Sequence, residues 1–266
     1  MKLAVIGGTG RTAIPVIKRA LDDHKVYALV RTPSKFPSDL KAHPNLTLVK
    51  GDIYDSKALS ELLIDAELVL VATAAPPLDP TTIVQDSVQA VIKHSTPSLK
   101  HVYLISSNGV GADTSQRPFF YRVVLHPFLL HNNYQDLAVA EQKLKEFCTN
   151  GTKFTIFHPV QIWNTDPTFD VVVYEQTYGA PLAEYSNQIT YEDLARIVYQ
   201  EIKEHKFSNK TVVVNSTLRL GSFTDPRTEA RGVLILAMKR YIPRLILGLG
   251  LAGFGIGYLF KRFLKN

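Results

Sequence analysis

A glycine-rich run near the start of the chain, Gly7-Gly8-Thr9-Gly10-Arg11-Thr12-Ala13, is the feature that most constrains the fold. The apolar residues 3–6 lead directly into this run, and residues 12–21, which are compatible with a helix, follow it. Residues 26–30 then form a second apolar run. The predicted order of strand, tight turn, helix and strand is that of a βαβ unit.

The small residues of this run suit a turn that binds phosphate groups. Gly7 allows a sharp turn after the strand, Gly10 leaves the backbone open to a pyrophosphate, and Ala13 lets the helix pack on the sheet. The free N–H groups at the start of the helix then face the phosphates. The spacing is Gly-x-x-Gly-x-x-Ala, and we interpret it as a dinucleotide-binding loop rather than a Gly-rich turn without a ligand. The expected cofactor contacts in the run are Gly7, Thr9, Gly10, Arg11 and Thr12.

Arg31 follows the second apolar run, where folds that bind NAD place an acidic residue for the ribose 2′-hydroxyl. A guanidinium group suits a 2′-phosphate instead, so the sequence predicts NADP as the cofactor. Lys35 is close enough in the sequence to help hold the same phosphate. The alternative is a solvated arginine that contacts no ligand.

Strands and helices are expected to alternate along most of the remaining chain. The expected strands are 46–50, 68–73, 101–106, 153–157 and 211–215, and the expected helices are 56–63, 81–94, 133–148 and 190–203. This alternation predicts an α/β fold with a doubly wound, mostly parallel Rossmann sheet in residues 1–216. Residues 160–188 show no strong periodicity and carry tyrosines and the only tryptophan. We expect them to form a small insertion on the substrate side.

The excess of positive charge is confined to the C-terminal end of the chain. From Arg231 onward there are seven basic residues and no acidic ones, whereas the rest of the chain has 23 basic and 24 acidic residues. The body is therefore nearly neutral, and we expect no nucleic-acid partner. The spacing of the histidines favours no metal site. The single cysteine, Cys148, excludes an internal disulfide framework, and we expect it to be a buried helix residue.

Residues 245–260 are strongly apolar and uncharged, with Arg244 before them and Lys261 after them. As a helix they would rise about 24 Å, a little less than the ~30 Å of a bilayer core, and the flanking basic side chains could extend this reach. A buried helix that covers the sheet is the alternative, although the five glycines in this stretch are unfavourable for a soluble helix. We predict a connecting helix over 217–241 and a membrane anchor over 242–266, with the body in the cytosol at the mitochondrial outer membrane or the endoplasmic reticulum.

Six motifs in register resemble a known family. They are Gly-Gly-Thr-Gly-Arg-Thr-Ala, Leu-Val-Arg-Thr-Pro-Ser-Lys, Gly-Asp-Ile-Tyr-Asp, Ile-Ser-Ser-Asn-Gly-Val, Ala-Glu-Gln-Lys-Leu and Phe-Thr-Ile-Phe-His-Pro. The series is similar to the atypical short-chain dehydrogenase/reductases of the NAD(P)H-binding, NmrA-like and biliverdin-reductase-B-like kind, and the resemblance covers residues 1–216. It implies a Rossmann fold with NADP on Gly7, Gly10, Arg31 and Asp52. It also implies a nicotinamide near Ala74 and Ser106.

The chain departs from this pattern at the catalytic dyad. Enzymes of the wider superfamily use Tyr-x-x-x-Lys, in which the tyrosine gives a proton to the substrate oxygen and the lysine lowers the pKa of the tyrosine. Counted back from Glu141, the corresponding positions hold Asn133 and Leu137. The family's Arg-Pro after the sixth strand is His158-Pro159 here.

The candidate catalytic residues are therefore Ser106, Tyr134 and His158. Ser106 ends a strand where a hydroxyl can polarise a carbonyl, Tyr134 can donate a proton if it faces inward, and His158 has a suitable pKa for acid–base work. For each residue a structural role is the alternative. We predict an NADP-dependent oxidoreductase that transfers hydride to a small carbonyl, quinone or flavin. A catalytically silent NADP sensor or scaffold protein at a membrane is the alternative function.

Overall fold

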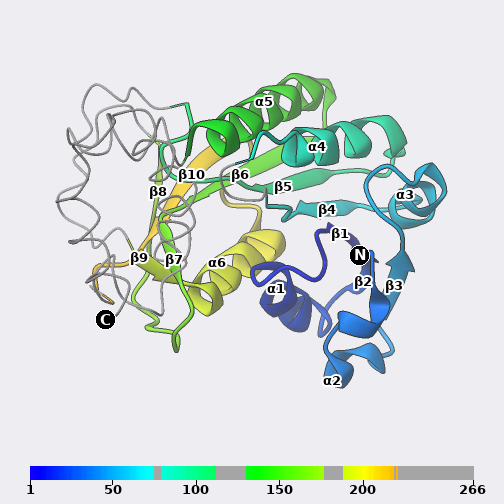
Figure 1. Cartoon of the computed structure of the whole chain (residues 1–266), viewed down its shortest axis with the longest axis horizontal. Coiled ribbons are helices and arrows are strands. Elements are labelled where there is room, and N and C mark those ends of the chain that lie inside the picture. Colours follow the sequence, from blue (N-terminus) through cyan, green and yellow to red (C-terminus); the bar gives the residue numbers. More distant parts are fainter. Residues whose placement is uncertain (75–78, 112–129, 177–187, 219, 221–266) are drawn as a thin grey trace, which may run out of the picture.

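Eight strands form one sheet, and helices cover both of its faces (Figure 1). The computed structural model describes residues 1–74, 79–111, 130–176, 188–218 and 220. The strand order is β3-β2-β1-β4-β5-β6-β10-β8, in which only β8 is antiparallel to its neighbour. This is the predicted α/β sheet of the Rossmann type. Its strands are β1 Lys2–Ile6, β2 Lys25–Val30, β3 Leu46–Lys50, β4 Leu68–Val71, β5 His101–Ile105, β6 Lys153–Pro159, β8 Val172–Glu175 and β10 Lys210–Asn215.

The helices separate into two layers. Helices α1 (Ala13–Ala20) and α6 (Tyr191–Glu204) pack together on one face of the sheet. Helices α3 (Ser56–Leu63), α4 (Ile83–His94) and α5 (His131–Phe147) cover the other face. Two short helices, the 3-10 helix η1 (Pro33–Lys35) and the α-helix α2 (Ser38–Lys41), follow β2, and the 3-10 helix η4 (Cys148–Asn150) follows α5.

Local sequence explains most of these elements. All four residues of β4 are fully buried, as expected for a central parallel strand that is covered on both faces. The side chain of Asp55 accepts hydrogen bonds from the N–H groups of Lys57 and Ala58, and so caps α3. Thr190 caps α6 in the same way through the N–H of Asp193. The expected elements in the described residues are present, with boundaries that differ by a few residues.

The described residues of the segment 160–188, the expected insertion, contribute strands to both sheets. Residues Val172–Glu175 form β8, which pairs with β10 and extends the main sheet at its edge. Residues Gln161–Trp163 form β7, which pairs in parallel with β9 (Gln188–Thr190). Residues 177–187 lie outside the described part of the chain.

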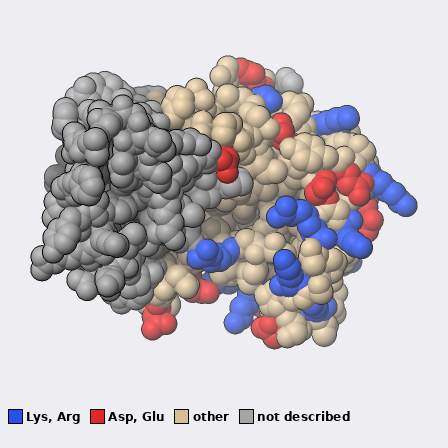
Figure 2. Space-filling view, viewed as in Figure 1, with Lys and Arg blue, Asp and Glu red and all other residues tan. Residues whose placement is uncertain are grey.

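The predicted connecting helix over 217–241, apart from residues 217, 218 and 220, and the predicted anchor over 242–266 also lie outside the described residues. Within the described part, no helix is long and apolar enough to cross a membrane. On the described part of the face in Figure 2, basic and acidic side chains lie among one another rather than in separate fields.

Candidate functional site

Two glycines of the loop between β1 and α1 leave little room for a side chain. Gly7 has φ +87°, and a Cβ atom there would lie 2.7 Å from the carbonyl oxygen of Ala72 at the end of β4. The N–H of Gly10 donates to the carbonyl oxygen of Gly7 at 2.9 Å, and a Cβ atom on Gly10 would lie 3.1 Å from that oxygen. The glycines therefore form a tight turn against β4, and this turn leaves the start of α1 open to a ligand.

A pocket of about 580 Å³ lies beyond the carboxyl ends of β1 to β4. This is the position at which open α/β sheets bind their ligands. The predicted residues Gly7, Thr9, Gly10, Arg31, Asp52 and Ala74 all line it. The other lining residues are Leu29, Gly51, Ile53, Tyr54, Ala72, Thr73, Thr81, Thr82 and Ile83. We refer to this cavity as the glycine-loop pocket.

The remaining predicted cofactor residues lie outside the lining of the glycine-loop pocket. Thr12 is the N-cap residue of α1, and Arg11 lies beside it with its guanidinium carbon 5.8 Å from the ring centre of Tyr191. Lys35 is exposed at the end of η1. Ser106 is 7% exposed and directs its hydroxyl toward α5.

Tyr54, which was not predicted as a site residue, borders the glycine-loop pocket. The hydroxyl of Tyr54 donates to a carboxylate oxygen of Asp86 in α4 at 3.0 Å, and Thr82 donates to the same oxygen at 2.7 Å. The hydrogen bond to Asp86 raises the pKa of Tyr54. Asp52 accepts the N–H of Tyr54 at 2.8 Å. These contacts connect the turn after β3 to the start of α4 across the pocket.

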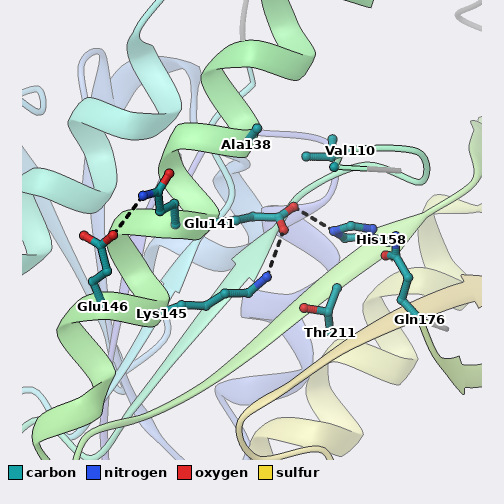
Figure 3. Close-up of a pocket in the computed structure, with 10 residues that line it drawn as sticks. Val110, Ala138, Glu141, Lys145, Glu146, His158, Gln176 and Thr211 are labelled. Carbon is teal, nitrogen blue, oxygen red and sulfur yellow. Dashed lines mark hydrogen bonds and ion pairs between the residues drawn. The ribbon is translucent and has the colours of Figure 1, made fainter. Parts of the chain in front are cut away.

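Two of the three predicted catalytic residues, Ser106 and His158, contact Glu141 of α5, which was not predicted as a site residue. Figure 3 shows Glu141 with His158. The Oε1 atom of Glu141 accepts the hydroxyl of Ser106 at 2.5 Å and lies 2.7 Å from Nε2 of His158. Tyr134 lies apart from this group, because its hydroxyl donates to the carbonyl oxygen of Asn108 at 2.8 Å. The sequence feature that could have identified Glu141 as a site residue is its place in the Ala-Glu-Gln-Lys-Leu motif.

Glu141 is ionised in this buried setting. Burial by itself favours the neutral form, but hydrogen bonds from His158 and Ser106 and the nearby charge of Lys145 together lower the pKa of Glu141 below its usual value. The ammonium group of Lys145 lies 3.5 Å from the Oε2 atom of Glu141. Cys148 is buried, as predicted, and burial raises the pKa of its thiol to about 12, so it is not a nucleophile at neutral pH.

A second cavity, of about 410 Å³, lies beside Glu141 and His158, and we call it the His158 pocket. Residues from α5, the loop after β5, and strands β6 and β10 line it, together with Gln176 after β8. It shares no lining residue with the glycine-loop pocket in the described part of the chain.

The fold and the glycine-loop pocket define a Rossmann-fold protein that binds a nicotinamide dinucleotide. The chain belongs to the NAD(P)H-binding family, whose model matches residues 7–205. A comparison with curated protein sequences gives no match.

Solved structures of several reductases share this fold. A short-chain dehydrogenase/reductase from Veillonella parvula, in complex with NADP, superposes with a TM-score of 0.66 at 15% identity over 84% of this chain and 99% of that chain. A proposed NADH-flavin reductase from Streptococcus pneumoniae has a TM-score of 0.61 at 18% identity over 81% and 99% of the two chains. An oxidoreductase from Lactococcus lactis has a TM-score of 0.62 at 14% identity over 90% and 98%. At these identities the likeness concerns the fold.

Proposed function

We propose that this protein is an NADP-dependent oxidoreductase that transfers hydride to a flavin, a quinone or a small carbonyl compound. The observation that carries this proposal is Arg31 in the wall of the glycine-loop pocket. Arg31 follows the last residue of β2, where an acidic residue would favour the free 2′-hydroxyl of NAD. A cation at this position pairs with a 2′-phosphate. The Veillonella parvula structure in complex with NADP supports the same choice.

Different residues of the glycine-loop pocket would contact different parts of the dinucleotide. The loop from Gly7 to Gly10 would hold the pyrophosphate close to its backbone, and Asp52 and Tyr54 would border the adenine. Thr73 and Ala74, after β4, would lie toward the nicotinamide. The bound cofactor supplies the hydride, and the protein positions it and keeps water from the reacting atoms.

The hydrogen bonds of two predicted catalytic hydroxyl groups favour a flavin or quinone among the three acceptors. Ser106 donates its proton to Glu141, and Tyr134 donates its proton to the backbone at Asn108. A carbonyl acceptor needs a proton donor at its oxygen, whereas a flavin or quinone accepts hydride readily and takes a proton from water. The name of the Streptococcus pneumoniae neighbour agrees with this preference.

The proposal is tested with the full chain by fluorescence titration of NADPH and NADH, followed by NADPH oxidation with FMN, menadione and a panel of small aldehydes. We expect tighter binding of NADPH than of NADH, and turnover with FMN or menadione. If neither dinucleotide binds, both the proposed oxidoreductase function and the assignment of the glycine-loop pocket as a dinucleotide site are contradicted.

A catalytically silent NADP sensor or scaffold is the second candidate. The observation that favours it is the pair Asn133 and Leu137 in α5, at the positions where the superfamily places its tyrosine and lysine. Tight NADPH binding without turnover of any acceptor in the panel would favour this function over the first.

We further propose that residues 242–266 attach the protein to the mitochondrial outer membrane or the endoplasmic reticulum, because the uncharged stretch 245–260 is flanked by basic residues. Fractionation of cells that express the full chain tests this. We expect the wild type in the membrane fraction and a Leu251→Asp variant in the soluble fraction. Recovery of the wild type in the soluble fraction would contradict the proposal.

A further inference from the structure

His158 lines the His158 pocket and has a buried ring nitrogen without a hydrogen-bond partner among the described residues. The residue is fully buried in β6, and its Nε2 atom lies 2.7 Å from Glu141. Because a carboxylate only accepts hydrogen bonds, the Nε2 atom carries a proton, and with that proton as the only one on the ring the Nδ1 atom is an acceptor. The Nδ1 atom has no hydrogen-bond partner in the part of the chain that the structure describes.

Gln176 provides a second buried acceptor in the same pocket. Its Oε1 atom also lacks a hydrogen-bond partner among the described residues, and its side chain extends toward His158 in Figure 3. Buried polar atoms are almost always paired, and an unpaired acceptor is unfavourable unless a donor is supplied. Two such acceptors in one cavity indicate a ligand that brings N–H groups with it.

The rest of the lining adds a donor and apolar contacts. The ammonium group of Lys145 points into the space between α5 and β10, where it lies 3.5 Å from Glu141 (Figure 3). Val110 and Ala138 provide apolar surface. The volume of about 410 Å³ lies within the usual range for small-molecule sites.

We propose that the His158 pocket binds a small planar molecule that carries a primary carboxamide. The N–H groups of the amide donate to His158 Nδ1 and Gln176 Oε1, its carbonyl oxygen accepts from Lys145, and its apolar part lies against Val110 and Ala138. A carboxylic acid lacks the two donors, and a simple amine lacks the acceptor, so neither complements all three groups.

This site is separate from the proposed hydride-transfer site. Thr211, which lines the pocket, is the second residue of β10 and is in register with Ile156 in the middle of β6. The His158 pocket therefore lies over the α5 face of the sheet, whereas the glycine-loop pocket lies at the carboxyl edge. The carboxamide ligand is thus additional to the dinucleotide and the hydride acceptor.

The test uses benzamide as the probe and N,N-dimethylbenzamide, which has no N–H donor, as its matched control. Binding to the full chain is followed by the ¹⁵N shift of the His158 Nδ1 atom in protein with labelled histidine. The Ala138→Phe variant fills the pocket without removing a polar group, and Val139→Phe adds the same ring at the exposed neighbouring position. The Gln176→Ala variant removes one acceptor.

We expect saturable binding of benzamide to the wild type and to Val139→Phe, and no binding to Ala138→Phe. In Gln176→Ala, binding should weaken about tenfold, the usual effect of one hydrogen bond. Three results would overturn the proposal: equal binding of the dimethyl analogue, displacement of benzamide by NADPH, or a His158 Nδ1 atom that already accepts the Gln176 amide before benzamide is added. Displacement by NADPH would place the amide in the dinucleotide site, and none of the three results contradicts NADPH binding, so the proposed function is judged separately.

Discussion

The carboxylate of Asp136 in α5 accepts the backbone N–H of Val84 in α4 at 3.0 Å, and it also accepts the N–H of Gln85 at 2.9 Å. Asp136 is 1% exposed. Thr82, the N-cap residue of α4, makes no capping hydrogen bond with its own side chain. Asp136 of the neighbouring helix α5 therefore caps α4. This cap lies next to Thr82 and Ile83, which line the glycine-loop pocket.

Replacement of Asp136 by alanine should lower the free energy of unfolding by about 1–3 kcal/mol, because two buried N–H groups lose their partner. NADPH affinity should also fall, since the start of α4 borders the pocket. Urea unfolding and NADPH titration measure both effects. The exposed neighbour Gln135→Ala is the control, and an equal effect of the two substitutions would contradict the capping role.

Replacement of Arg31 by aspartate should weaken NADPH binding by about 10–100-fold, because the 2′-phosphate loses a charged partner and meets a like charge. NADH affinity should change much less. Lys25→Asp makes the same change of charge on an exposed residue at the other end of β2, and it should leave the selectivity unchanged. If Arg31→Asp keeps the preference of the wild type, the assignment of NADP is wrong.

Gly7 and Gly151 both have positive φ, but only Gly7 is close to other backbone atoms. A Cβ atom on Gly7 would lie 2.7 Å from the Ala72 oxygen, whereas a Cβ atom on Gly151 would meet nothing within 4 Å. The Gly151→Ala variant should therefore lose about 1–2 kcal/mol of stability from backbone strain alone and keep NADPH binding. The Gly7→Ala variant should lose more stability, and it should also lose NADPH binding. Thermal unfolding and fluorescence titration of the two variants test this difference.

The Glu141→Gln variant should be less stable than the wild type by about 1–3 kcal/mol at pH 7, because the charged hydrogen bonds to His158 and Ser106 are weakened. The pKa of Glu141 is lowered in the folded state, so its contribution is complete above the unfolded pKa of about 4.3 and is lost as the pH falls through the folded value. The difference between wild type and variant should therefore shrink in acid. The exposed Glu146→Gln on the same helix should show no such pH dependence.

His101 should make the fold sensitive to acid. It is 3% exposed, stacks on Tyr103 and His205, and lies 2.9 Å from the hydroxyl of Thr155. Burial, with the charge of His205, lowers its pKa to about 4. Because the unfolded residue protonates near pH 6.5, stability should fall by about 3 kcal/mol between pH 6.5 and 4.

Urea unfolding at pH 7, 6, 5 and 4 measures this loss. The His101→Gln variant should show a flatter profile over that range, and the exposed His131→Gln variant should follow the wild type. A wild-type profile that is flat between pH 6.5 and 4 would contradict the buried neutral state of His101.

Much of the fold was predictable because its signals are local. The consecutive apolar residues of β1 and β4 identify buried parallel strands, and Asp55 identifies the start of α3. The glycine loop is recognisable because Gly7 has a positive φ in its own turn and has no room for a Cβ atom beside Ala72, at the end of the neighbouring strand β4. The edge strand β8 was not predicted, since Val172–Glu175 has no distinctive period and becomes a strand by pairing with β10.

The sequence by itself therefore determined the class of fold, the loop that approaches the phosphates and the cation at the end of β2, because each depends on residues a few positions apart. Only the tertiary structure decided that Ser106 and His158 share the carboxylate of Glu141, and that Tyr134 bonds to the backbone at Asn108 instead. These side chains come from β5, β6 and α5, and their contacts depend on how α5 is rotated on the sheet. Short-range periodicity does not specify that rotation; the packing of the whole core does.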